Sequence, residues 1–269
     1  MNNIPNILSI AGSDPSGGAG VQADLKVISA LGGYGMAAVT ALTAQNTMGV
    51  RSVVHVPARF MRDQIETVFD DIDVSAVKIG MLGNAEIMEE IACCLEQYQP
   101  KNIVLDPVMV ATSGDSLIDM DAIACLKKRL IPMADIITPN IPEAEKLMRK
   151  SVIDMEMFAQ NLLDLGARSV LLKGGHLKGD VMRDVFADQD GVETFEAPRV
   201  ETDNTHGTGC SLSSAIAVYL GHGLSMREAC KKAKDYVTCA LGWADALSVG
   251  GGHGPLHHTY CLTQKERST

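Results

Sequence analysis

A glycine-containing turn, His206-Gly207-Thr208-Gly209-Cys210, directly precedes an apolar stretch that is expected to form a helix. Two glycines let the backbone of this turn approach a ligand closely. The N–H groups from Gly207 to Cys210 then lie in a first helical turn, where they have no partner within the helix and where the helix dipole favours negative charge. The turn is therefore predicted to bind an anion such as a phosphoryl group in transfer.

Cys210 ends this turn and lies in the first turn of the expected helix. A thiol there is predicted to have a pKa below its usual value, because the helix dipole and the N–H groups stabilise a thiolate. Such a thiolate could accept the proton of a hydroxyl group that attacks a phosphate. The alternative is a small cysteine that only packs the helix, which is the commoner role of free cysteines. The surrounding glycines favour the functional interpretation.

Asn140 and Glu143 follow an expected strand and stand three residues apart, so they lie on one side of a first helical turn. Beside a phosphate, this pair could hold a magnesium ion through water. The same residues could instead cap the helix, with Asn140 at the N-cap and Pro142 at the first helical position. The two interpretations are equally favoured.

Lys173 and Asp106 also stand at the ends of expected strands. Lys173 could neutralise nucleotide phosphates as a point charge, or it could be a solvated lysine in a turn. Asp106 could bind a cation or cap the segment that follows it. Together with the glycine turn, these side chains indicate an enzyme that transfers phosphate to a small alcohol.

Asp24 and Gln45 lie just beyond a glycine-rich loop and an expected strand, and they offer a carboxylate and an amide. Such a pair fits the edge of a flat ring that contains nitrogen atoms. Met81, Val108 and Met109 are apolar residues after other strands and could enclose that ring. For the two methionines, a place in the ordinary core is at least as well supported.

Several classes of protein are disfavoured by what the sequence lacks. The formal net charge of −10 is spread along the chain and leaves no basic footprint for nucleic acid. The loop 12–20 matches neither the Walker pattern G-x-x-x-x-G-K-[ST] nor the dinucleotide fingerprint G-x-G-x-x-G, which disfavours a dinucleotide oxidoreductase. The spacing of His206, His253, His257 and His258 matches no zinc template.

The seven cysteines are odd in number and include no C-x-x-C pair, so we expect reduced thiols in a cytoplasmic protein. The first residues show neither the charged start nor the long apolar core of a signal peptide. No apolar run is long enough to span a bilayer. The expected partner is a small-molecule substrate, with no nucleic acid and no membrane.

The elements between these loops must bring the loops together. The 269 residues are 46% hydrophobic and contain no low-complexity linker, which predicts a single domain over residues 1–269. Apolar strands alternate with helices, an order that predicts a mainly parallel sheet covered on both faces. Ligands of such sheets bind beyond the carboxyl ends of the strands, where the residues above are expected to lie. The expected strands are 7–11, 36–44, 50–56, 76–79, 102–105, 135–137, 169–172 and an antiparallel pair, 181–187 and 192–197; the expected helices are 19–31, 58–69, 85–96, 119–130, one from near Pro142, 155–165, 207–219 and 225–246.

Seven segments resemble, in order, the hydroxymethylpyrimidine/phosphomethylpyrimidine kinases of thiamine biosynthesis. They are Ala11–Lys26, Thr43–Thr47, Lys78–Leu82, Asp106–Met109, Thr138–Asn140, Lys173–His176 and Asn204–Cys210. The matches extend from about residue 7 to Pro255, so the resemblance covers nearly the whole chain. The combination is specific to this family, although no single segment is.

The resemblance implies a ribokinase-like three-layer α/β/α sandwich with a mostly parallel central sheet, and a homodimer as the usual assembly. It implies phosphorylation of 4-amino-5-hydroxymethyl-2-methylpyrimidine to the monophosphate and then to the diphosphate, with ATP and Mg²⁺. Most of the superfamily carries aspartate where this chain has Cys210, and the cysteine is typical of this family. By the matching positions, the pyrimidine would contact Gly12, Asp24, Gln45, Met81 and Val108. The anion hole would extend over Gly207, Thr208, Gly209 and Cys210, and Cys210 would also be the base. ATP would be bound by Lys173, Asn140 and Thr205, and Mg²⁺ would be held by Asp106 and Glu143 with help from Asn140.

Two other functions compete with this one. Bacterial pyridoxal kinases that resemble this family share the opening Ser16–Gly20 and the cysteine, but Gln45 and the segment Lys173–His176 are more similar to the pyrimidine kinases. A non-catalytic sensor on the same scaffold is disfavoured, because the chain retains the groups that phosphate transfer needs.

The second phosphorylation has a phosphate rather than an alcohol as its acceptor. A phosphate monoester is largely ionised near neutral pH, so it hardly needs a base. Cys210 is therefore expected to matter more for the first step than for the second.

Overall fold

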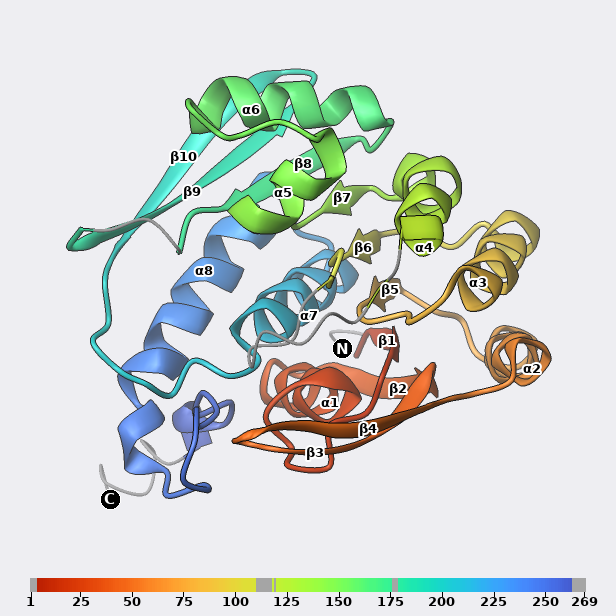
Figure 1. The fold of residues 1–269 in the computed structure, drawn as a ribbon, viewed down its shortest axis with the longest axis horizontal. Helices are drawn as coiled ribbons and strands as arrows, with labels where there is room; N and C mark the ends of the chain where they lie inside the picture. Colours follow the sequence, from red (N-terminus) through yellow and green to blue (C-terminus); the bar gives the residue numbers. More distant parts are fainter. Residues whose placement is uncertain (1–3, 110–117, 119, 176–178, 263–269) are drawn as a thin grey trace.

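Eight strands form the central sheet of the computed structural model, which describes residues 4–109, 118, 120–175 and 179–262 (Figure 1). Their order across the sheet is β10-β9-β8-β7-β6-β5-β1-β2. Strands β1, β2 and β5 to β8 are parallel, and β9 and β10 add an antiparallel edge, so the predicted mostly parallel sheet is confirmed. The bounds are β1 (Asn6–Ala11), β2 (Tyr34–Val39), β5 (Ala76–Ile79), β6 (Ile103–Leu105), β7 (Ile136–Ile137), β8 (Ser169–Lys173), β9 (Val181–Asp188) and β10 (Gly191–Pro198).

Helices cover both faces of this sheet and complete three layers (Figure 1). One face carries α1 (Gly20–Ala30), α7 (Thr208–Gly221) and α8 (Met226–Gly242). The other carries α2 (Ala58–Phe69), α3 (Ala85–Tyr98), α4 (Met120–Cys125), α5 (Ile141–Met148) and α6 (Met155–Leu162). Short helical turns follow α4, α6 and α8, at Leu126–Leu130, Ile131–Met133, Leu163–Leu165 and Ala244–Ala246. None of the described helices is long and apolar enough to cross a membrane.

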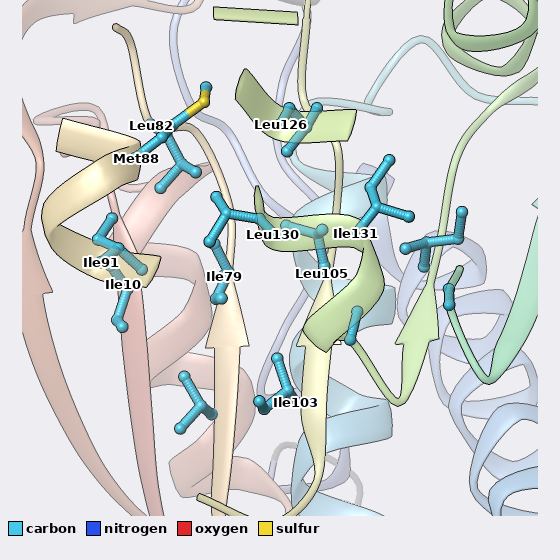
Figure 2. Close-up of a cluster of buried hydrophobic side chains, with 14 of the residues drawn as sticks. Ile10, Ile79, Leu82, Met88, Ile91, Ile103, Leu105, Leu126, Leu130 and Ile131 are labelled. Carbon is cyan, nitrogen blue, oxygen red and sulfur yellow. The ribbon is translucent and has the colours of Figure 1, made fainter. Parts of the chain in front are cut away.

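The strands are apolar on both faces because helices cover both. Figure 2 shows side chains of neighbouring strands, Ile10, Ile79 and Leu105, close to Ile91 of α3 and to Leu130. Other side chains of the same strands point into a second core, toward α1, α7 and α8. Two buried polar residues interrupt these strands, Ser9 in β1 and Lys78 in β5.

The expected strand 36–44 is wrong, because the chain forms two strands there. β2 ends at Val39, and β3 (Ala41–Asn46) pairs with β4 (Gly49–His55) in a separate antiparallel sheet. Thr40 lies between β2 and β3, and its hydroxyl donates to the Met81 carbonyl at 2.7 Å. Figure 1 shows β3 and β4 as a ribbon set off from the main sheet near α1.

Candidate active site

Gly207 precedes α7, which begins at Thr208, one residue later than expected. Its φ of 80° is left-handed, and a Cβ there would overlap the carbonyl oxygen of Gly18. Both the backbone and the available space therefore require glycine. The first bond of the helix joins the Ser211 N–H to the Gly207 carbonyl at 2.9 Å.

The turn His206–Cys210, called the anion turn after its predicted ligand, offers fewer N–H groups than predicted. The Thr208 N–H donates to the Thr205 carbonyl at 3.3 Å, and the Thr208 hydroxyl donates to the same oxygen at 2.6 Å. The N–H groups of Gly209 and Cys210 are first-turn groups with no acceptor inside the helix. The Thr205 side chain belongs to an exposed residue, and its contact with ATP stays a prediction.

Asp14 joins the glycine-rich loop before α1 to the anion turn. Its carboxylate accepts the N–H groups of Gly18 at 3.1 Å and Ala19 at 2.8 Å, and it lies 2.8 Å from His206 Nε2. Burial alone would raise the pKa of Asp14, but hydrogen bonds from His206, Ser16 and Ala19 outweigh it and lower the pKa to about 2. The sequence patterns did not identify this clamp, because Asp14 and His206 are 192 residues apart.

Lys173 and Asp106 face the anion turn from the ends of β8 and β6. Lys173 Nζ lies 2.8 Å from Asp106 Oδ1, which also accepts the Thr138 hydroxyl at 3.0 Å. Burial alone would lower the pKa of Lys173, but the negative charges of Asp106 and Glu143 raise it. The ammonium therefore stays charged, and the solvated-lysine alternative is wrong. His176, the last residue of this motif, lies outside the described residues.

Asn140 and Glu143 form a complete capping box at the start of α5. Asn140 Oδ1 accepts the Glu143 N–H at 2.9 Å, and Glu143 Oε2 accepts the Asn140 N–H at 2.8 Å. The capping interpretation is confirmed. Burial raises the pKa of Glu143 to about 7; the nearby Lys173 charge opposes this rise and Asp106 adds to it.

The carboxylates of Asp106 and Glu143 fit a magnesium ion that is shared with a nucleotide. No group of three or more His, Cys, Asp or Glu side chains arranged for a metal occurs among the described residues. Mg²⁺ in phosphate-transferring sites is usually bound by one or two carboxylates together with substrate phosphates and water. Asp106 lies beside Lys173, whose Nζ is 2.8 Å from Asp106 Oδ1, and Glu143 is buried at the start of α5.

Replacing Glu143 by glutamine is expected to flatten the pH dependence of stability. The folded-state pKa of about 7 exceeds the ordinary value of 4.5, so between these values the folded chain holds a proton that the unfolded chain has lost. Wild-type stability should therefore fall as the pH rises from about 5 to about 8, more steeply than that of the variant. Denaturant unfolding at several pH values measures both slopes.

Glu86→Gln is the matched control, because Glu86 also lies in a first helical turn, that of α3, but is exposed. This control should keep the wild-type slope. If the stability of Glu143→Gln depended on pH as steeply as that of the wild type, Glu143 would not be the group that holds the extra proton of the folded chain.

Two of the expected ring-binding residues, Gly12 and Met81, contact each other at the loop that follows β1. The Met81 side chain covers Gly12, where a Cβ would overlap its terminal methyl group. Gln45 lies on β3 and borders a cavity of about 30 Å³ together with His206. Val108 is half-buried, whereas Met109 is fully buried in the core, so its predicted place beside a ring is wrong.

Asp24 does not present a free carboxylate to this pocket. Its side chain is fully buried; Oδ1 accepts Lys78 at 2.9 Å and Ser214 at 2.8 Å, and Oδ2 accepts Lys78 at 2.8 Å and Ser9 at 2.6 Å. An ionised carboxylate has about four acceptor positions, so all of them are occupied. The structure therefore contradicts the expected contact between Asp24 and a ring.

Cys210 is half-buried at the start of α7, and its pKa is raised to about 11, the opposite of the prediction. Loss of solvent is the largest cause, and the charges of Asp24 and Asp106 add to it. The charge of Lys78 and a hydrogen bond from the Gly20 backbone N–H act in the other direction. The favourable contacts thus do not offset dehydration, and the thiol is protonated near neutral pH.

This chain is similar in sequence to known kinases over nearly its whole length. The family model described as phosphomethylpyrimidine kinase matches residues 14–257. The hydroxymethylpyrimidine/phosphomethylpyrimidine kinase of Escherichia coli is 47% identical over 94% of this chain and 97% of that protein. The chain spans about half, 52%, of a thiamine biosynthesis bifunctional protein of Geobacter sulfurreducens, to which it is 50% identical.

Solved structures share the fold. The phosphomethylpyrimidine kinase of Clostridium difficile has a TM-score of 0.79 and 44% identity, over 89% of this chain and 100% of that one. The pyridoxal kinase of Bacillus subtilis, solved as an ADP complex, has a TM-score of 0.88 and 34% identity, over 97% of this chain and 100% of that one. The predicted ribokinase-like α/β/α fold is thereby confirmed.

Proposed function

Because the chain belongs to the phosphomethylpyrimidine kinase family, we propose that it phosphorylates 4-amino-5-hydroxymethyl-2-methylpyrimidine with ATP, first to the monophosphate and then to the diphosphate, in thiamine biosynthesis. One observation supports this most strongly. A Cβ on Gly209 would lie 3.1 Å from Lys173 Nζ and 3.4 Å from Asp106 Oδ2. The first turn of α7 thus lies close to a cation, and glycine at position 209 keeps a side chain from crowding the Lys173 ammonium, an arrangement that supports phosphoryl transfer here.

The phosphate end of the site consists of Lys173, Asp106, Asn140 and Glu143. Lys173 neutralises the phosphates of ATP, and Thr205 contacts them from the loop before α7. Asp106 and Glu143, with help from Asn140, hold Mg²⁺, which supplies neutralisation of the charge that develops on the transferred group. The cap on α5 keeps Glu143 in place for this role.

The ring end consists of Gln45, Met81, Val108 and Gly12. The Gln45 amide, which can both donate and accept, pairs with the polar edge of the pyrimidine. Met81 and Val108 pack against its faces, and the absence of a side chain at Gly12 leaves room for Met81 to do so.

Cys210 accepts the hydroxyl proton in the first phosphorylation. Because its pKa is about 11, the thiol must lose its own proton before it can do so. The first step should consequently accelerate as the pH rises above neutrality. The second step starts from a phosphate that is already ionised, so Cys210 contributes less to it.

Pyridoxal is the rival substrate, because pyridoxal kinases share this fold. With equal concentrations of the free pyrimidine and pyridoxal and with Mg-ATP, we expect pyrimidine mono- and diphosphate as the main products by mass spectrometry. Predominant pyridoxal phosphate would support the rival kinase. Failure to phosphorylate either ring would support a sensor.

A cytoplasmic homodimer is the assembly that we propose. Leu42 and Val54 are paired across β3 and β4, and both side chains are exposed, which leaves an apolar face for a second copy. Light scattering measures the mass in solution, and a monomer would contradict this assembly.

A further inference from the structure

A buried ion pair lies behind the candidate active site, on the side of α1 and α7. Lys78 and Asp24 are both 0% exposed, and the Lys78 ammonium contacts both carboxylate oxygens, at 2.8 and 2.9 Å. A Cβ on Gly80 would lie 2.7 Å from Lys78 Nζ, so the ammonium reaches to the end of β5, where the ligand loops begin. The pair is therefore close to the reacting groups but closed to solvent.

The same carboxylate ties α1 to α7 in a specific register. Asp24 accepts the Ser214 hydroxyl at 2.8 Å, and one turn earlier on each helix the Gly20 N–H donates to the Cys210 thiol. Residues four apart lie on one face of a helix, so the two contacts between the helices, Asp24 with Ser214 and Gly20 with Cys210, are stacked one turn apart. The Asp24–Ser214 hydrogen bond therefore holds the Gly20–Cys210 contact in place.

Stability alone does not account for this arrangement. Replacement of a buried ion pair by apolar residues of similar volume is often neutral or stabilising, because two charges no longer have to be dehydrated. Loss of one partner alone, in contrast, is strongly destabilising. A lysine and an aspartate with every acceptor position occupied do, however, fix one geometry, which an apolar pair would not.

We propose that Lys78 and Asp24 are positioning residues that hold the start of α7 against the start of α1 and thereby place the Cys210 thiol for the first phosphorylation. This inference rests on the proposed role of Cys210. Lys78 also supplies the positive charge that opposes Asp24 and Asp106 at the thiol. The pair thus acts on Cys210 through both geometry and charge.

The test combines Asp24→Leu with Lys78→Met, which removes both charges together and is expected to leave a folded protein. We expect kcat of the alcohol step to fall at least tenfold, with KM for the pyrimidine and kcat of the second step changed less than threefold. Alkylation of Cys210 by iodoacetamide near pH 8, followed by peptide mass spectrometry, should slow at least threefold. The exposed Cys239 serves as the internal control and should react as before.

Ser214→Ala is the milder variant, since it removes one hydrogen bond and no charge. Its matched control is Ser213→Ala, because the equally buried Ser213 hydroxyl bonds only to carbonyl groups of α7 itself. Ser214→Ala should reduce the alcohol step more than Ser213→Ala does.

Two results would overturn the proposal: a folded double variant with wild-type alkylation and wild-type rates, or an equal loss in both phosphorylation steps. Alkylation needs no substrate, so it tests the positioning of Cys210 even if the proposed reaction is wrong.

Discussion

Cys210→Ala is expected to slow the first phosphorylation by about 10²- to 10⁴-fold, the usual contribution of a positioned base. The hydroxymethyl group must lose a proton as it attacks, and without Cys210 no thiolate can form at the start of α7 to receive it. The second phosphorylation should slow far less, because a phosphate monoester is ionised near neutral pH. Single-turnover assays that start from the free pyrimidine and from its monophosphate separate the two steps.

Cys239→Ala is the control for this experiment, because Cys239 is exposed on α8. It should leave both rates unchanged. The raised pKa of Cys210 adds a second signature: the wild-type alcohol step should accelerate between about pH 7 and pH 9, and the residual rate of Cys210→Ala should not. Equal slowing of both steps in Cys210→Ala would contradict a role specific to the alcohol.

Gly207→Ala is expected to destabilise the protein by about 2–5 kcal/mol, as the sum of left-handed backbone strain and overpacking. The new methyl group would meet the Gly18 carbonyl, so the glycine-rich loop before α1 and the start of α7 could no longer pack. Activity in both steps should fall with it, because both use the same anion turn. Denaturant unfolding and the two single-turnover assays measure the two effects.

Gly223→Ala separates the effect of left-handed backbone strain from the effect of steric overlap with a neighbouring residue. Gly223 has a φ of 87°, close to that of Gly207, but nothing lies within 4 Å of a Cβ there. This control should cost only about 1–2 kcal/mol and leave the rates unchanged. Equal losses in the two variants would mean that close packing against Gly18 is not what Gly207 provides.

Patterns local in the sequence predicted much of the fold. Apolar runs such as Ile7–Ala11 and Ala76–Ile79 became strands of a parallel sheet, because helices cover both of its faces. The expected strand 36–44 was wrong, since apolar residues continue through Thr40 while the backbone leaves the sheet. That departure depends on hydrogen bonds from Thr40 to Ala11 and Met81, which no local pattern contains.

In the candidate site, too, local sequence patterns predicted some features, whereas others depend on contacts between distant residues. Glycines before an apolar stretch predicted the start of α7, and Asn-x-x-Glu offered a helix cap as one of two interpretations, because both depend on neighbouring residues. The environment of Cys210 depends on burial and on Asp24, Asp106 and Lys78, which come from other elements, so its raised pKa could not be predicted from its place in a helix. One signal was present for Lys78: a charged residue in the middle of a buried strand needs a partner.

The most direct test of the central claim is a time course of the purified protein with Mg-ATP and 4-amino-5-hydroxymethyl-2-methylpyrimidine, followed by mass spectrometry. We predict that the monophosphate forms first and then declines as the diphosphate accumulates. The absence of any phosphorylated pyrimidine would contradict the account.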